Sequence, residues 1–73
     1  MDGIKEYDKV RIKHKNIVGR VIDIFMDSNG KTYYDVESLT PGYVDDPDAY
    51  PGYWPQYTCT EDQLELISSG DLE

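Results

Sequence analysis

The feature that most constrains the fold is a tight-turn signal, Asp27-Ser28-Asn29-Gly30, between two segments rich in β-branched and aromatic residues. Asn-Gly accepts the positive φ angles that a two-residue hairpin turn requires. The segments on either side, residues 17–26 and 31–38, are therefore predicted to be paired antiparallel strands. Gly19 interrupts the first strand, and a glycine inside a strand marks a bulge, a bend or the close approach of another backbone.

A further strand is predicted before this hairpin. Residues 9–13 alternate between apolar and basic side chains, which is typical of a strand with one face toward a core. Val10 and Ile12 share the apolar face, and we expect both side chains to be buried.

The C-terminal part of the chain contains two more strand patterns, residues 57–60 and 64–67. Thr60 and Gln63 between them have the spacing of a capping box, which predicts one helical turn at residues 61–63. The predicted core draws on all five strands and consists of Val10, Ile12, Val21, Ile24, Tyr34, Val36, Cys59, Leu64 and Leu66.

Residues 39–56 form a long segment with four prolines and two glycines, which rule out a helix or a central strand there. Long loops of this kind are commonly functional or disordered, and the aromatic residues of this one argue that it is ordered. Two interpretations are open. The rings of Tyr50, Tyr53, Trp54 and Tyr57 could fold over the core as a lid, or some of them could remain exposed as a contact surface.

Seventy-three residues make one domain near the lower size limit for a core without staples. We assign residues 1–67 to this domain and expect residues 68–73 to be a flexible tail. The presence of Met1 suggests a complete small protein. Cys59 has no second cysteine to pair with, no apolar run is long enough to span a membrane, and no signal peptide opens the chain, so we expect a cytoplasmic protein.

The order of these patterns resembles a known family. The strand "DKVRI", the glycine-broken strand "GRVIDIF", the strand "YYDV" and the final "YTCTEDQLELI" are similar to the Src-homology-3-like small barrels, nearest to the KOW-type and Tudor-type variants. The resemblance covers residues 7–38 and 57–67 and leaves the loop outside it. It implies an all-β, five-stranded, mostly antiparallel barrel with one short helical turn before the last strand. Barrels of this family bind RNA, DNA, proline-rich peptides, methylated side chains or other subunits.

Charge divides the chain at Lys31, its last basic residue. Residues 1–31 contain seven basic and five acidic residues, whereas residues 32–73 contain ten acidic and no basic residues, so the parts carry +2 and −10. Such an acidic, tyrosine-rich segment repels phosphate backbones and suits contact with another protein. We therefore do not expect nucleic acid to be the partner.

The predicted function is that of a non-catalytic module that binds another protein, with a basic partner favoured. Five of the nine aromatic residues fall in residues 43–57, and tyrosine and tryptophan are enriched at binding hot spots. Aspartates between them would favour a basic ligand, with cation–π contacts contributing. The predicted partner-binding residues are Tyr43, Asp45, Asp46, Asp48, Tyr50, Tyr53 and Trp54.

Two other functions stay open. An acidic inhibitor of bacteriophage or mobile-element type could mimic nucleic acid with the carboxylates of Asp35, Glu37, Asp45, Asp46 and Asp48. The third possibility is RNA binding of the KOW kind through the basic cluster Arg11, Lys13, His14, Lys15 and Arg20. The net charge of −8 opposes the binding of a phosphate backbone.

No pattern predicts an enzyme, a metal site or a cofactor. His14 and Cys59 are the only residues of their kinds, so the usual four-ligand zinc site cannot form. The aspartates of residues 45–48 do not match the spacing of a calcium-binding loop. Cys59 is expected to be a small buried hydrophobic residue.

Overall fold

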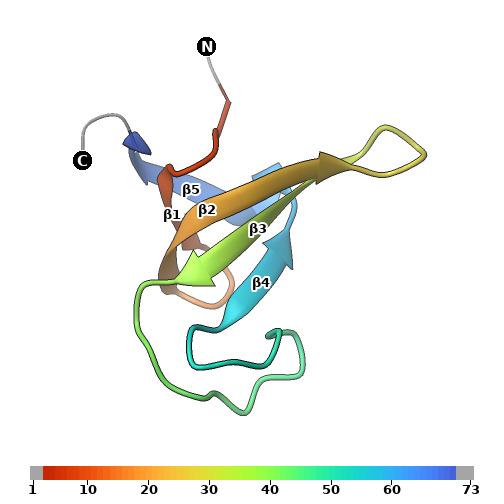
Figure 1. The fold of residues 1–73 in the computed structure, drawn as a ribbon. Helices are drawn as coiled ribbons and strands as arrows, with labels where there is room; N and C mark the ends of the chain where they lie inside the picture. Colours follow the sequence, from red (N-terminus) through yellow and green to blue (C-terminus); the bar gives the residue numbers. More distant parts are fainter. Residues whose placement is uncertain (1–2, 71–73) are drawn as a thin grey trace.

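A computed structural model of the chain describes residues 3–70, which form a single five-stranded antiparallel sheet and one 3₁₀ turn. The elements in chain order are β1 (Lys9–Ile12), β2 (Ile17–Met26), β3 (Thr32–Ser38), β4 (Gln56–Cys59), η1 (Glu61–Gln63) and β5 (Leu64–Ser68). The sheet has the strand order β4-β3-β2-β1-β5 (Figure 1). The predicted all-β fold and the predicted helical turn are confirmed, with every strand end within one residue of its expected position.

The turn between β2 and β3 is longer than predicted. Met26 pairs with Thr32, and the Asp27 N–H donates to the Lys31 carbonyl at 2.9 Å, which leaves a three-residue loop. Only Gly30 in this loop has a positive φ, +85°. The Asp27 carboxylate accepts the backbone N–H groups of Asn29 and Lys31, which stabilises this longer turn. The prediction of a two-residue turn at Asn-Gly is therefore wrong, whereas the predicted hairpin is confirmed.

Gly19 is required by close packing within the sheet. It pairs with Val10 of β1 on one side and with Ser38 of β3 on the other. A Cβ atom at this position would lie 2.6 Å from the Glu37 carbonyl oxygen and 2.6 Å from Cγ1 of Val36. Of the three explanations expected for Gly19, a bulge, a bend or the close approach of another backbone, the structure shows the close approach of another backbone. The irregularity in β2 lies nearby, between Val21 and Asp23.

The core contains seven of the nine predicted residues: Val10, Ile12, Val21, Tyr34, Val36, Cys59 and Leu64. Ile24 is only partly buried and packs against this core. Leu66 was predicted wrongly, because it is 46% exposed. It lies on β5, an edge strand that pairs with β1 alone, next to a bulge in that pairing. Tyr57, which the prediction left out, is buried in the core from β4.

The C-terminal segment is tied to the start of the chain. Asp8 is buried, and its carboxylate accepts the N–H of Lys5 at 2.8 Å and the N–H of Gly70 at 3.0 Å. The flexible tail expected from Ser68 onward therefore does not begin there, since Ser68 is part of β5 and Gly70 is hydrogen-bonded. Residues 71–73 of that expected tail lie outside the described residues.

The β2–β3 hairpin and the η1 turn complete the fold. The distal part of the β2–β3 hairpin extends past the other strands (Figure 1), and the rings of Phe25 and Tyr33 stack on it with centroids 5.6 Å apart. The η1 turn has the predicted cap, with the Gln63 side chain accepting the Thr60 N–H at 3.0 Å. Among residues 3–70, no helix has the length and apolar character needed to cross a membrane.

Candidate functional site

The loop predicted for residues 39–56 spans residues 39–55, since Gln56 begins β4, and it lies at the end of the sheet away from both termini (Figure 1). Backbone hydrogen bonds hold it at several points, from the Gly42 N–H to the Tyr53 carbonyl and from the Tyr50 N–H to the Gln56 carbonyl, both at 2.7 Å. Pro55 is fully buried beside the core, and Ala49 packs against the core from the middle of the loop. The loop is therefore ordered by its own backbone contacts and by small apolar anchors.

Lys15 fastens this loop to the turn between β1 and β2. Its Nζ atom lies 2.9 Å from the Asp46 carboxylate and 3.1 Å from the Asp48 carboxylate, with the Tyr57 ring centroid 5.6 Å away. The hydrogen bond to Asp46, followed by that to Asp48, raises the pKa of Lys15. The same hydrogen bond from Lys15, helped by the Asp48 N–H, lowers the pKa of Asp46. We call this group the Lys15 clasp.

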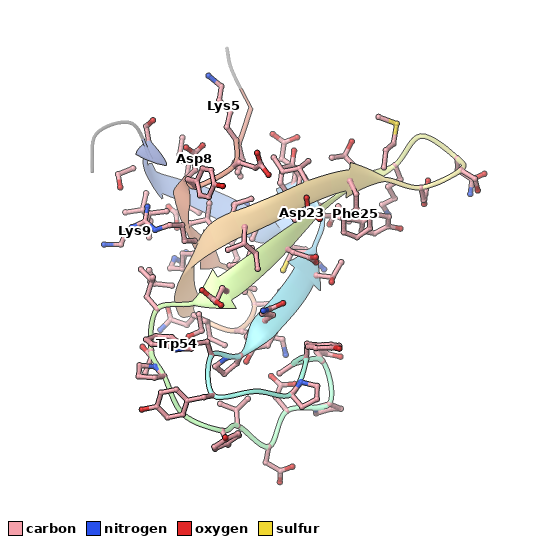
Figure 2. The ribbon with its side chains drawn as sticks, viewed as in Figure 1. Lys5, Asp8, Lys9, Asp23, Phe25 and Trp54 are labelled. Carbon is pink, nitrogen blue, oxygen red and sulfur yellow. The ribbon has the colours of Figure 1, made fainter. Side chains whose placement is uncertain are left out.

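Three rings of the loop form an exposed row. Tyr43 meets Tyr53 edge to face with centroids 6.0 Å apart, and Tyr53 meets Trp54 in the same way at 5.8 Å. Their exposed fractions are 80%, 55% and 45%, respectively. We call these three residues the aromatic row, and Figure 2 shows Trp54 on the loop, far from Phe25 on the hairpin. Tyr50 is also exposed, but within the described residues no ring contact joins it to the row.

The predicted site residues therefore separate into groups. Of the four rings that the lid interpretation would bury, only that of Tyr57 is buried, and Pro55 is buried and Ala49 packed against the core near it. The other three, Tyr50, Tyr53 and Trp54, are exposed. Asp46 is paired with Lys15 and only 22% of its side chain is exposed, whereas the Asp48 side chain is 69% exposed. Asp45 faces solvent. Sequence reasoning could not assign Asp46 this internal role, because its partner is 31 residues away.

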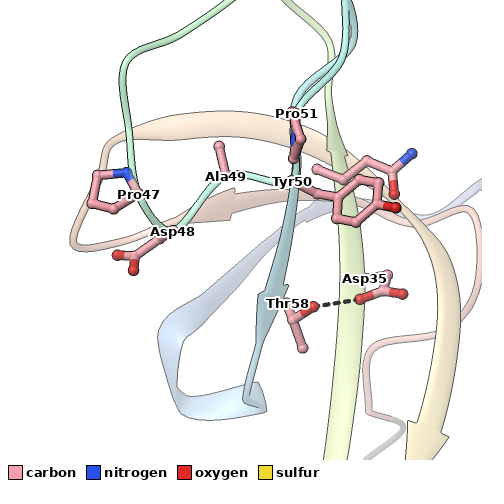
Figure 3. Close-up of a pocket in the computed structure, with 8 residues that line it drawn as sticks. Asp35, Pro47, Asp48, Ala49, Tyr50, Pro51 and Thr58 are labelled. Atoms are coloured by element: carbon pink, nitrogen blue, oxygen red, sulfur yellow. Dashed lines mark hydrogen bonds between the residues drawn. The ribbon is translucent and has the colours of Figure 1, made fainter.

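A groove beside β4 adds residues that the sequence did not single out. It has a volume of about 550 Å³, and its walls include Asp35, Asp48, Tyr50, Pro51, Gln56 and Thr58 (Figure 3). The Thr58 hydroxyl donates to Asp35 at 2.7 Å. We call this the β4 groove. A second hollow of about 330 Å³ lies on the loop between Tyr43 and Tyr50. The sequence patterns do not show that residues 57–60 lie at an edge of the sheet, so they do not locate the β4 groove.

The basic cluster is largely engaged inside the molecule. Arg11 forms a salt bridge with Glu65 at 2.7 Å and also donates to Asn16. Arg20 donates to the Tyr7 carbonyl at 2.8 Å, and Lys15 belongs to the clasp. Groups that already have acidic or carbonyl partners offer less attraction to a phosphate backbone.

The single thiol is chemically quiet. Cys59 is buried, and burial raises its pKa to about 11, so it stays protonated at neutral pH and is a poor nucleophile. Among residues 3–70, the His, Cys, Asp and Glu side chains do not gather in groups of three or more that could hold a metal ion.

Comparison with protein-family models, curated proteins and solved structures finds no match to this chain. The aromatic row, the Lys15 clasp and the β4 groove are therefore the features of the molecule that point to a function.

Proposed function

We propose that this protein is a non-catalytic protein-binding module with an SH3-like barrel, and that it binds a basic partner through the loop of residues 39–55. The observation that carries the proposal is the aromatic row. Tyr43, Tyr53 and Trp54 present contiguous exposed ring surface on a loop that is already fixed in place. Tyrosine and tryptophan provide large rigid contact area with few torsions to immobilise, which is why they dominate hot spots.

Charge supports a basic ligand, although with fewer carboxylates than the sequence predicts. Asp45 faces solvent and most of the Asp48 side chain is exposed, so both can act on a partner at the loop. Asp46 contributes mainly by holding the loop through Lys15. A lysine or arginine above the exposed rings would gain cation–π attraction beside these carboxylates.

The experiment is selection of ligands from a displayed random peptide library, followed by titration of the selected peptides by fluorescence anisotropy. We expect enrichment in lysine and arginine. Replacing Tyr53 or Trp54 with alanine should weaken binding by about 2 kcal/mol, which is roughly 30-fold. Unchanged affinity in both variants would refute the role of the aromatic row.

Phe25→Ala is the matched control, because Phe25 is 42% exposed but lies on the hairpin, away from Trp54 (Figure 2). It should leave the affinity for the selected peptides unchanged. Melting temperatures of all three variants separate a binding defect from a folding defect.

Salt and ligand class distinguish this proposal from the two other functions. A nucleic-acid mimic would depend on Asp35, Glu37 and the loop aspartates, and would lose affinity steeply as salt screens them. A KOW-like RNA-binding module would show submicromolar binding to RNA in gel-shift titrations, which our proposal does not expect.

A further inference from the structure

The exposed edge of β4 carries backbone groups that face away from the sheet. β4 is the last strand of the order β4-β3-β2-β1-β5, so only one of its sides is paired with another strand. The Pro55 carbonyl points toward β3, where it accepts a hydrogen bond from the N–H of Ser38. The Gln56 carbonyl points to the opposite, outer side, where it accepts one from the N–H of Tyr50. Because successive backbone groups of a strand point to opposite sides, the N–H and C=O of Thr58 point outward like those of Gln56.

Within residues 3–70, backbone pairing covers this edge at a single position. Tyr50 forms an isolated antiparallel bridge with Gln56, as the first residue of an added strand would. The preceding residues then leave the edge, because Asp46 accepts the N–H of Asp48 on its side chain and that of Ala49 on its carbonyl, both at 3.0 Å. The Lys15 clasp fixes this turn. The β4 groove is the space that opens beside Thr58 as a result (Figure 3).

The walls of the groove are suited to a basic residue in an extended chain. Asp35 and Asp48 lie on opposite sides of Thr58 in Figure 3. Asp48 is paired with Lys15 at 3.1 Å, but 69% of its side chain is exposed, so it can receive a second cation from the groove. The Thr58 hydroxyl is a neutral donor, so the charge of Asp35 remains at the groove. Tyr50 and Pro51 supply an apolar wall. An open strand edge is a template for another extended chain.

We propose that the β4 groove binds an extended segment of the partner protein, which adds to the sheet beside Thr58 and places a lysine or arginine between Asp35 and Asp48. The bound segment would lie along the outer edge of β4 next to Tyr50, where residues 46–49 turn away from the strand. This inference rests on the proposed function, since it names the form in which a basic protein partner engages the domain. It assigns the main-chain contacts to Thr58 and leaves the aromatic row as an adjacent contact surface.

The test uses ¹⁵N NMR of the full chain titrated with a seven-residue acetylated and amidated peptide, alternating threonine and valine with one central lysine. We expect the Thr58 amide to shift and to exchange more slowly with solvent on binding. The same peptide with glutamate in place of lysine should bind about tenfold more weakly.

Backbone methylation tests the strand addition directly. Two further peptides carry N-methyl groups on alternate amides, one on the odd and one on the even positions. Only one set can face β4, so one methylated peptide should lose binding and the other should retain it. Equal affinities of the two would overturn the proposal. This comparison uses the unaltered protein and so does not depend on any variant folding.

Variants of the protein provide the second arm. Asp35→Asn and Asp48→Asn should each weaken binding of the lysine peptide, whereas Glu6→Gln, which removes an exposed charge near the start of the chain and outside this groove, should not. Thr58→Pro removes the outward N–H and should abolish binding, and an edge strand tolerates proline at such a position.

The outcomes separate this inference from the proposed function. Shifts confined to Tyr43, Tyr53 and Trp54, with the Thr58 amide unchanged, would overturn the groove and support the aromatic row alone. Shifts at Thr58 that do not change in the Tyr53→Ala and Trp54→Ala variants would support the groove and count against the row. Shifts at Thr58 that appear on raising the protein concentration without peptide would identify a second copy as the occupant and overturn the proposal.

Discussion

Gly19→Ala is the substitution that tests the packing of this sheet most directly. The added Cβ would lie 2.6 Å from the Glu37 carbonyl oxygen and 2.6 Å from Val36 Cγ1, whereas ordinary contacts begin at 3.4 Å. The two strands would have to separate by about 0.8 Å at a point where β2 pairs on both sides. One of the atoms belongs to the backbone, so rotation of a side chain cannot relieve both contacts.

The expected cost follows from these distances. Overpacking a well-packed site costs about 1–3 kcal/mol, and the backbone contact places Gly19 near the upper end of that range. Replacing a glycine in a strand by alanine also stabilises the folded state by about 0.5–1 kcal/mol, because glycine loses the most conformational freedom on folding. The net loss is then about 2 kcal/mol. In a domain of this size each kcal/mol changes the melting temperature by about 4–8 °C, so we expect a decrease of about 8–16 °C.

Thermal and urea unfolding followed by circular dichroism provide the assay. Gly3→Ala is the control, because its Cβ would meet only the end of the Glu61 side chain, at 3.2 Å, and that side chain is exposed. We expect this variant to remain within about 0.5 kcal/mol of the unaltered protein. A Gly19→Ala variant as stable as the Gly3→Ala variant would refute the close approach of β2 and β3.

Three further predictions concern single residues. Cys59 should react with a thiol reagent at pH 8 only when denaturant is added, because its pKa of about 11 keeps the buried thiol protonated, and rapid labelling of the folded protein would contradict this. Asp8→Ala should lower the free energy of unfolding by about 2 kcal/mol in urea titrations, because the N–H groups of Lys5 and Gly70 lose their acceptor; a change below about 0.5 kcal/mol would count against that role. The Lys15 clasp should be complete between the ordinary values of 3.8 for Asp46 and 10.5 for Lys15. It should open as the pH falls through the lowered pKa of Asp46 or rises through the raised pKa of Lys15, and NMR shifts of Asp46 that change near neutral pH would contradict this.

The strands could be predicted from the sequence because their signals are local. Alternation places Val10 and Ile12 on one face regardless of what covers them, and the spacing of Thr60 and Gln63 determines the helical turn. The exposure of Leu66 could not be predicted from such a local signal. Its alternation with Leu64 is correct, but its exposure depends on β5 being an edge strand.

The candidate site was only partly predictable, for a similar reason. A proline-rich aromatic segment predicts an ordered loop, and the exposure of Tyr43 and Tyr53 agrees with the contact-surface interpretation. The pairing of Lys15 with Asp46 joins residues far apart in sequence, and composition alone counts them as separate charges. The β4 groove depends on where the chain leaves the strand edge, which is a property of the turn at residues 46–49.

The Lys15 clasp changes how the acidic half of the chain should be understood. A loop with prolines and acidic residues would ordinarily lose much conformational freedom when it binds, and that loss would oppose affinity. Here the clasp, the Gly42–Tyr53 backbone bond and the buried Pro55 order the loop before any partner arrives. Asp46 mainly holds the loop in place, Asp48 both holds the loop and remains largely exposed, and Asp35 and Asp45 are outside the clasp. The exposed rings and the charge of Asp35 can therefore contribute to binding without a further ordering cost in this loop.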